Sequence, residues 1–251
     1  MKAIILAAGR GSRMKDLTES KPKCLVSVHG RPLIEWQLNA LRRKEITSIG
    51  IVTGYRREML EKYKLTEFIN KDWASTQMFS SLSCAHRWLE EDTCIISYSD
   101  IFYEPEAINL LIESNSNLAI TYDPNWHEIW SKRFSDPLLD AETFRLSSSS
   151  CLLEIGKKTS STLDIEGQYM GLLRITPDGW KEIESVLKSL RKTERDKIQL
   201  TTVLQTLIEK ASYKIEAIPY LGGWGEVDSA SDISTYELEA DGQAPFIKSK
   251  D

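Results

Sequence analysis

Cysteine and histidine are scarce in this sequence, and long apolar runs are missing. Four cysteines and three histidines occur in 251 residues; the cysteines form no CxxC pair and the histidines have no metal-ligand spacing. We therefore expect neither a zinc site nor a disulfide framework, and interpret the thiols as reduced and cytoplasmic. No stretch approaches the roughly 20 apolar residues that a membrane span needs, and the apolar segment of the opening MKAIILAAGRG is too short for a signal peptide. We expect a cytoplasmic protein that makes no membrane contact.

Positive charge is also in short supply over the chain as a whole. Lysine and arginine number 32 against 37 aspartates and glutamates, a formal net charge of −5. Nucleic-acid binding needs clustered positive charge, so this balance argues against a nucleic-acid partner. The first thirty residues are the exception, because they contain six basic residues and only two acidic ones. This local basic segment can still bind a small phosphorylated ligand.

Apolar segments alternate with amphipathic ones in the first half of the chain, which predicts βαβ units and a mostly parallel sheet. Strands are expected at residues 2–8, 48–53, 68–70, 93–98 and 118–122, and helices from Pro32 onwards and at 56–63, 78–89 and 104–113. In the second half, strands are expected at 143–155, 168–175 and 213–218, with Ser147–Ser150 as a turn between strands, and helices at 177–190, 198–210 and 229–240. No linker rich in Pro, Gly or Ser divides the chain. We therefore expect one Rossmann-like α/β domain over residues 1–251, with helices flanking the sheet and a small β-rich lid near residues 124–170.

A glycine-rich turn follows the first strand, in the segment LAAGRGSRM at residues 6–14. This is the position at which α/β sheets bind nucleotide phosphates, because backbone N–H groups are available there. The dinucleotide motif GxGxxG needs a third glycine where Met14 stands, and the P-loop needs that glycine and also a Ser or Thr where Asp16 stands. The sequence therefore disfavours NAD-dependent hydride transfer and Walker-type ATP hydrolysis.

The residues around this turn nevertheless predict a phosphate site. Gly9 and Gly11 let the backbone approach phosphate oxygens, which Arg13 and Lys23 can bind. A solvated basic turn is the alternative, but it does not explain the order of strand, glycines, arginine and Pro-Lys. Here the sequence resembles the nucleotidyltransferases, whose pattern is LAAGxGxRL…PK, with Met14 in place of the leucine. The resemblance implies a GT-A-like fold and catalytic roles for Arg13 and Lys23.

The nucleotide contacts that the resemblance implies lie in two segments. They are Leu6, Ala7, Ala8, Gly9, Gly11, Ser12 and Arg13 in the loop, and Gln77 and Ser81 in STQMFSSL. The second segment corresponds to the family's TNMxxSL, in which asparagine is usual at the position of Gln77. Gln77 and Ser81 can hydrogen-bond a pyrimidine edge, although a polar helix start is the alternative interpretation. We expect a nucleotide-binding half at about 1–122, an acceptor-binding half at about 123–228, and a C-terminal helix and tail at 229–251.

Two aspartates are candidate metal ligands. Asp100 follows the strand expected at 93–98, and Asp228 lies in GGWGEVD before the last helix. Phosphate chemistry brings anionic oxygens together, and Mg²⁺, which needs only one or two carboxylates, relieves their repulsion. The resemblance places metal aspartates at both positions, and Glu226 is a weaker candidate. A turn or helix-cap role is the alternative for the two aspartates.

The second half resembles bacterial choline-phosphate cytidylyltransferases in particular. The shared motifs are YDPNW at 122–126, Trp130 with Arg133-Phe134, DAETF at 140–144, GQYMG at 167–171 and GGWGEVD at 222–228. The acceptor contacts that this likeness implies are Trp126, Trp130, Glu142, Tyr169 and Trp224. Aromatic faces beside carboxylates suit an ammonium group, although each loop tryptophan is as well explained by packing. Gln199 replaces a family aspartate, so the acceptor can differ from phosphocholine.

These residues predict a Mg²⁺-dependent cytidylyltransferase that joins CTP, or another NTP, to a phosphocholine-like phosphorylated amine and releases pyrophosphate. A sugar 1-phosphate, an aminoalkyl phosphonate and a phosphorylated amino acid such as phosphoglutamine are alternatives within the same chemistry. A non-catalytic nucleotide-binding regulatory protein is a further alternative, but it would be expected to lose Arg13, Lys23 or the aspartates, and all are present. From the family we also expect a homo-oligomer and a role in decorating a surface polysaccharide or lipid.

Overall fold

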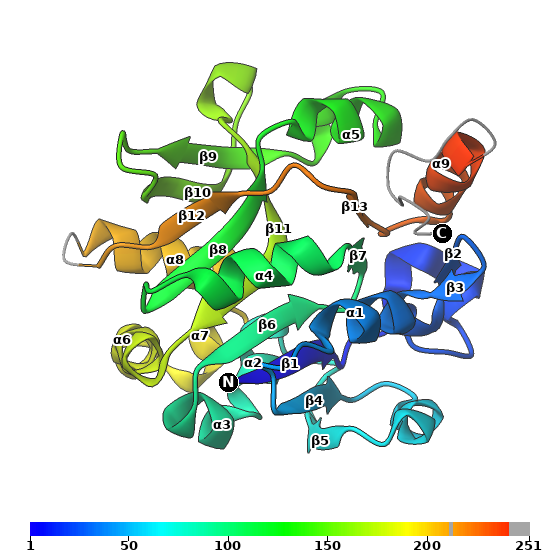
Figure 1. Ribbon diagram of the computed structural model, residues 1–251, viewed down its shortest axis with the longest axis horizontal. Helices are drawn as coiled ribbons and strands as arrows, with labels where there is room; N and C mark the ends of the chain where they lie inside the picture. The colour runs from blue at the N-terminus through cyan, green and yellow to red at the C-terminus, as the bar shows by residue number, and fades with distance from the viewer. Residues whose placement is uncertain (211–212, 241–251) are drawn as a thin grey trace.

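Seven strands form the central sheet of the computed structural model, which describes residues 1–210 and 213–240 (Figure 1). Their order across the sheet is β12-β8-β11-β6-β1-β4-β5. The strands are β1 (Lys2–Ala7), β4 (Ser48–Thr53), β5 (Thr66–Ile69), β6 (Cys94–Tyr98), β8 (Leu118–Asp123), β11 (Gln168–Ile175) and β12 (Glu216–Pro219). Among these described strands only β11 is antiparallel to its neighbours, β6 and β8, and the other pairs are parallel. The predicted mostly parallel α/β sheet is confirmed.

The first strand lies near the middle of the sheet because its side chains can be buried on both faces. Ala3, Ile4 and Ile5 are fully buried, and β1 pairs with β4 on one side and β6 on the other. A strand covered on both faces is a continuous apolar run rather than an alternating one. Since β1, β4 and β6 are parallel, their carboxyl ends meet at one edge of the sheet. The glycine-rich turn after β1 and Asp100 after β6 therefore lie at that edge.

Helices cover both faces of this sheet. They are α1 (Leu33–Leu41), α2 (Met78–Ser83), α3 (His86–Glu91), α4 (Pro105–Glu113), α5 (Trp126–Arg133), α6 (Pro177–Lys188), α7 (Lys192–Arg195), α8 (Leu200–Glu209) and α9 (Ala230–Ala240). α1 and α4 pack against each other in front of the sheet in Figure 1, whereas α3, α6 and α8 contact one another in series behind it. Proline occupies the first turn of α4 and of α6. Backbone N–H groups in the first turn make no hydrogen bond within the helix, so proline, which has no N–H, costs no hydrogen bond there.

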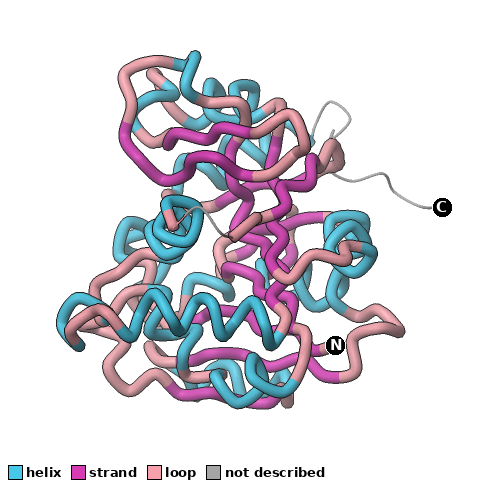
Figure 2. The backbone as a smooth tube through the Cα atoms, turned by 90° about the vertical axis from the view of Figure 1, so that its left-hand side faces the viewer, coloured by secondary structure: helices cyan, strands magenta, loops and turns pink. Residues whose placement is uncertain are grey.

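A β hairpin stands apart from the central sheet, at the top of Figure 2. It consists of β9 (Glu142–Leu146) and β10 (Leu152–Lys158), which are antiparallel and pack on α8. The remaining short elements are η1 (Ser12–Thr18), η2 (Lys23–Leu25), β2 (Ser27–Val28), β3 (Arg31–Pro32), η3 (Arg57–Tyr63), β7 (Ile101–Tyr103), η4 (Pro137–Leu139), η5 (Thr162–Asp164) and β13 (Trp224–Glu226). The hairpin is the small β-rich insertion expected from the sequence.

The structure divides one expected helix and adds elements that were not expected, among them the short strands β2, β3, β7 and β13. The helix expected at 78–89 is two helices, because Ala85 has φ −98° and ψ 17°, outside the helical region. The segment 143–155 forms two strands joined by a turn, and the turn expected at Ser147–Ser150 is confirmed; α5 and α7 were not expected. Residues 241–251 of the expected C-terminal tail lie outside the described residues.

Within 1–210 and 213–240, no helix has both the length and the apolar character to cross a membrane.

Candidate active site

A short antiparallel ladder between β7 and β13 brings Asp100 and Asp228 together. Glu226 is the register partner of Ile101, and the Val227 N–H donates to the Asp100 carbonyl oxygen at 2.9 Å. Asp100 immediately precedes β7, and Asp228 follows β13 by two residues. The two candidate metal aspartates, far apart in sequence, are thus held side by side by backbone hydrogen bonds.

Lys23 lies between these two carboxylates. Its Nζ is 2.9 Å from Asp100 Oδ2 and 2.5 Å from Asp228 Oδ1, and the residue is only 8% exposed. Burial alone would lower the pKa of the ammonium group, but the two aspartates together raise it. Burial would likewise raise the pKa of Asp228, and Lys23 and the nearby arginines lower it instead. The lysine is therefore held as a cation and Asp228 as an anion.

The glycine-rich loop passes directly over this lysine. Gly11 has φ +71°, a left-handed conformation that favours glycine, and a Cβ added there would lie 2.9 Å from carbons of the Lys23 side chain. Arg13 follows in the same loop, and its Nη2 is 3.1 Å from Asp228 Oδ1. The Arg13 side chain is 70% exposed. The exposed Arg13 from the loop and the buried Lys23 from η2 thus converge on Asp228.

A buried arginine supports the carboxylates from the other side. The side chain of Arg133, at the end of α5, is fully buried, with Nη1 2.9 Å from Glu226 Oε2 and Nε 3.1 Å from Asp232 Oδ1. Asp232 Oδ2 in turn accepts hydrogen bonds from the backbone N–H groups of Asp228 and Ser229, each at 2.8 Å. Neither Arg133 nor Asp232 was among the predicted site residues. The Ser-x-x-Asp spacing of Ser229 and Asp232, which is typical of a capping box, could have identified the aspartate.

The acidic cluster offers ligands for a divalent cation. Asp100, Glu226 and Asp228 each contribute a carboxylate oxygen, and these oxygens lie within 4.8 Å of one another. Asp100 Oδ1 is buried and has no hydrogen-bond partner in the part of the chain that the structure describes. Burial and the neighbouring Asp228 raise the pKa of Glu226 to about 7, although Arg133 opposes them. Oxygen donors with an unused buried lone pair fit Mg²⁺, which prefers carboxylate ligands.

A cavity of about 330 Å³ opens beside this cluster. The predicted site residues that line it are Arg13, Asp100, Trp130, Glu142, Tyr169 and Asp228. Its other lining residues are Met78, Tyr98, Asp140, Lys158, Gln168, Met170, Gly171, Gln199, Thr201 and Glu226. Burial raises the pKa of Glu142, with Asp140 adding to the rise and Lys158 opposing it. The wall therefore carries both acidic and basic side chains next to Arg13 and the acidic cluster.

Two of the predicted acceptor residues do not line this cavity. Trp126 and Trp224 are 5% and 2% exposed, and their indole N–H groups donate to Ile165 O and Asp123 Oδ2. Both rings lie 6.2 Å from the ring of Trp130 and so pack around it. In these two cases the packing interpretation accounts for the observed contacts.

The predicted nucleotide residues are spread along the same edge of the sheet. Leu6, Ala7 and Ala8 are buried at the end of β1 and beyond it, whereas Gly9 and Ser12 are exposed in the loop. Gln77 is exposed at the start of α2. Ser81 is buried, and its Oγ accepts a hydrogen bond from Asn70 at 3.0 Å. The structure thus leaves the loop and Gln77 accessible to a nucleotide and ties Ser81 to a neighbouring side chain.

Comparison with known proteins assigns this site to a family. The family model described as the MobA-like NTP transferase domain matches residues 3–150, which is more than half of the chain. The chain belongs to the NTP transferases. The nucleotidyltransferase resemblance of the N-terminal motif is thereby confirmed, and with it the expectation of an enzyme rather than a non-catalytic relative.

This NTP transferase is similar to two curated relatives and one solved structure, all three of them cytidylyltransferases. It is 35% identical over 252 residues to the CTP:phosphoglutamine cytidylyltransferase of Campylobacter jejuni, covering 93% of this chain and 98% of that protein. It is 45% identical over 86 residues to the choline-phosphate cytidylyltransferase of Streptococcus pneumoniae, covering 33% of this chain and 38% of that one. A structure of CTP:phosphocholine cytidylyltransferase from Streptococcus pneumoniae superimposes with a TM-score of 0.72 at 22% identity, covering 95% of this chain and 98% of the other. The fold of this NTP transferase is therefore that of its nucleotidyltransferase relatives, and the resemblance to choline-phosphate cytidylyltransferases is confirmed.

Proposed function

We propose that this NTP transferase is a cytidylyltransferase, which joins CTP to a small phosphorylated compound and releases pyrophosphate. The observation that carries the proposal is the arrangement of Lys23 between Asp100 and Asp228, beneath the glycine-rich loop and beside the 330 Å³ cavity. Cytidylyltransferases among the relatives support CTP as the nucleotide. Transfer from an NTP needs cations at the phosphates and a neighbouring space for the acceptor, and this arrangement supplies both.

The nucleotide half of the site is assigned to residues 6–13, Lys23 and Gln77. In this proposal the loop backbone and Ser12 approach the triphosphate, and the exposed Arg13 exchanges its contact with Asp228 for phosphate oxygens. Lys23 provides a buried positive charge that cannot readily be lost, because its carboxylate partners raise its pKa. Gln77, exposed at the start of α2, is assigned to the pyrimidine edge.

Mg²⁺ is proposed as the metal, with Asp100 and Asp228 as its ligands and Glu226 beside them. When bound there, Mg²⁺ would neutralise charge on the phosphate oxygens. Arg133 and Asp232 hold the carboxylates in place, since their contacts fix both Glu226 and the backbone of Asp228.

Catalysis by these residues is positioning and charge stabilisation. The acceptor phosphate attacks the α-phosphorus in line, and pyrophosphate leaves. Arg13 and Lys23 stabilise the negative charge that builds up on the phosphate oxygens. No side chain needs to act as a general base, because a phosphate dianion is already a nucleophile at neutral pH.

For the acceptor we propose a phosphorylated compound with both an amino group and a carboxylate, such as phosphoglutamine. Glu142 and Asp140 lie in the cavity wall and suit an ammonium group, and Lys158 in the same wall suits a carboxylate. A relative that is 35% identical over 93% of the chain is named for phosphoglutamine. The cavity thus matches an acceptor that carries charges of both signs.

Phosphocholine is the second candidate, and the aromatic contacts favour it less than the sequence suggested. Trp126 and Trp224 lie behind the cavity wall, and the ring of Trp130 already has the Arg133 guanidinium 5.3 Å from its centroid. A trimethylammonium group would therefore find the half-buried Tyr169 and Tyr98 as its principal ring partners in the lining. This is a smaller aromatic surface than a quaternary ammonium site usually offers.

A pyrophosphate-release screen tests both parts of the proposal. The four NTPs are each combined with phosphoglutamine, phosphocholine, 2-aminoethylphosphonate and a sugar 1-phosphate in the presence of Mg²⁺. We expect release with CTP and phosphoglutamine, and much less with the other pairs. Release with phosphocholine alone would overturn the proposed acceptor, and no release with CTP and any acceptor would overturn the proposed reaction.

A further inference from the structure

A second cavity, larger than the one at the proposed active site, lies on the other side of α2. Its volume is about 570 Å³, and it is bounded by α2, α3, α6, α7 and the segment before α2. Met78 of α2 lines the active-site cavity, whereas Phe79, Ser80 and Ser83 line the second one. The two cavities share no lining residue. The larger cavity is therefore not a part of the site described above.

Three basic side chains from two helices line this cavity. Lys188 comes from the end of α6, and Lys192 and Arg195 come from α7. Among the described residues none of the three forms an ion pair, although basic side chains nearby do, such as Arg191 with Glu194. Unpaired cations that line one concave space favour an anionic group, and arginine and lysine together suit a phosphate.

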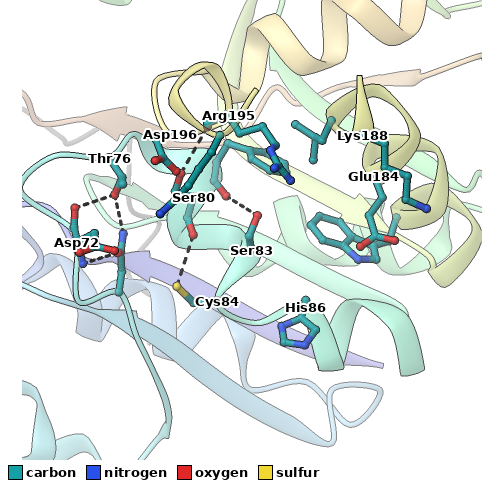
Figure 3. A pocket seen from close by; sticks show the side chains of 15 residues that line it. Asp72, Thr76, Ser80, Ser83, Cys84, His86, Glu184, Lys188, Arg195 and Asp196 are labelled. Carbon is teal, nitrogen blue, oxygen red and sulfur yellow. Dashed lines mark hydrogen bonds between the residues drawn. The ribbon is translucent and has the colours of Figure 1, made fainter. Parts of the chain in front are cut away.

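Acceptors for hydrogen bonds also line the cavity. Figure 3 shows Asp72 and Thr76 at one end and Lys188 with Glu184 at the other. Thr76 Oγ1 donates to the Asp72 carbonyl oxygen at 3.0 Å, so the Asp72 carboxylate is not used by that bond. Glu184 and Asp196 also belong to the wall, which therefore carries charges of both signs. A ligand with an anionic and a cationic end complements this wall better than a simple anion does.

The floor between the two ends is aromatic and includes an unused hydrogen-bond donor. Phe79 and Trp180 stack with their ring centroids 6.0 Å apart. Trp180 is 2% exposed, and its indole N–H is buried without an acceptor in the described part of the chain. Buried N–H groups nearly always have a partner. The floor is thus a place where the fold leaves a polar group unsatisfied.

One segment connects this cavity to the proposed nucleotide site. The Asp196 carbonyl oxygen accepts from the Gln77 N–H at 2.8 Å, the Arg195 carbonyl oxygen accepts from Ser80 Oγ at 3.4 Å, and Lys197 Nζ donates to the Ser75 carbonyl oxygen at 2.8 Å. A few residues further on, Gln199 lines the active-site cavity. A ligand held by Arg195 would therefore act on the backbone that positions Gln77.

We propose that this cavity is a second ligand site, for a small metabolite with a phosphate at one end and an amino group at the other. The phosphate binds Lys188, Lys192 and Arg195, and the amino group binds the end formed by Asp72. Occupancy changes the affinity for nucleotide through residues 195–199. The last statement rests on the proposed CTP site, whereas the existence of the ligand site does not.

Cys84 lines the cavity and gives a local test of ligand binding. Burial, with the nearby Asp72, raises the pKa of its thiol, so alkylation by iodoacetamide is followed at mildly alkaline pH and quantified by mass spectrometry. O-phosphoethanolamine is the probe, and Cys151, which is also partly exposed but lies outside the cavity, is the internal control. At ten times its dissociation constant the probe should slow alkylation of Cys84 about tenfold and leave Cys151 unchanged.

Charge variants show whether the protection comes from the proposed residues. The double variant Lys188→Ala, Lys192→Ala should lose the protection, and Lys181→Ala, which removes an exposed charge from α6 outside the cavity, should keep it. Equal alkylation of Cys84 with and without the probe would overturn the site, as would full protection of the double variant. Inorganic phosphate protecting as well as O-phosphoethanolamine would overturn the role of the amino end.

Nucleotide binding tests the connection between the two cavities. The dissociation constant of CTP is measured in EDTA, with and without O-phosphoethanolamine, for the wild type, Lys181→Ala and the double variant. We expect a shift of about fivefold or more in the first two proteins and none in the double variant. Protection of Cys84 without any shift would overturn the connection alone. A chain that does not bind CTP would refute the proposed function and leave the thiol result standing.

Discussion

Replacing Arg133 by methionine is expected to destabilise the protein far more than the loss of a surface ion pair. The Arg133 guanidinium is fully buried, 2.9 Å from Glu226, 3.1 Å from Asp232 and 3.7 Å from Asp228. Methionine keeps much of the aliphatic volume and removes the charge, so three carboxylates lose the cation that they share. Breaking a buried ion pair by removing one partner costs about 3–5 kcal/mol, because a buried charge is left uncompensated.

This cost corresponds to a large change in melting temperature. One kcal/mol lowers Tm by about 2–4 °C in a domain of this size, so Arg133→Met should lower Tm by about 6–20 °C. Circular dichroism during heating measures the change. Arg87→Met is the matched control, because the Arg87 side chain is 79% exposed and, within residues 1–210 and 213–240, forms an ion pair only with Glu91, one helical turn away. Its Tm should fall by less than about 4 °C. A decrease for Arg133→Met no larger than that of the control would refute the argument that this arginine compensates the buried carboxylates.

Four further predictions concern activity. Asp100→Asn should abolish pyrophosphate release while circular dichroism shows the fold unchanged, and near-wild-type turnover would contradict its metal role. Gly11→Ala should raise the KM for CTP about tenfold or more, since the added Cβ would displace Lys23 and loosen its phosphate contacts; Gly30→Ala, with φ +70° but open space around it, should leave that KM unchanged. Glu142→Gln should raise the KM for the acceptor and leave the KM for CTP within about twofold, because a lost charged hydrogen bond affects only the ligand it touches; equal effects on both would indicate general damage. EDTA should stop pyrophosphate release and added Mg²⁺ should restore it, and activity that persists in EDTA would argue against a metal at Asp100 and Asp228.

The central strands could be predicted because each is a strong local pattern. β1, β4 and β6 are short apolar runs closed by a polar or glycine residue, and such runs mark strands buried on both faces. α5 was missed for the opposite reason: its segment WHEIWSKR is mostly polar, and its buried face depends on contacts with α9 far along the chain. The break at Ala85 was missed because the apolar spacing on either side of it continues as in one helix. Tertiary packing decided both cases.

The site was predictable where a residue type alone carries the chemistry. The carboxylates of Asp100 and Asp228 and the cations Arg13 and Lys23 follow from motif and position, and the structure brings all four together. The tryptophans were harder, because an indole serves equally well in a cavity wall and in a core. Trp126 has its N–H satisfied by a backbone carbonyl oxygen, which no sequence pattern reveals.

The position of β11 in the sheet has a consequence for how the chain is made. β11 lies between β6 and β8, although both of those strands precede it in the sequence. A nascent chain that has not yet reached residue 168 holds β8 with neither β11 nor β12 available to pair with it. The segment 3–150 that defines the family by sequence also ends before both strands. Translation must therefore pass residue 175 before the half that carries the glycine-rich loop can be joined to β8 through a complete β11.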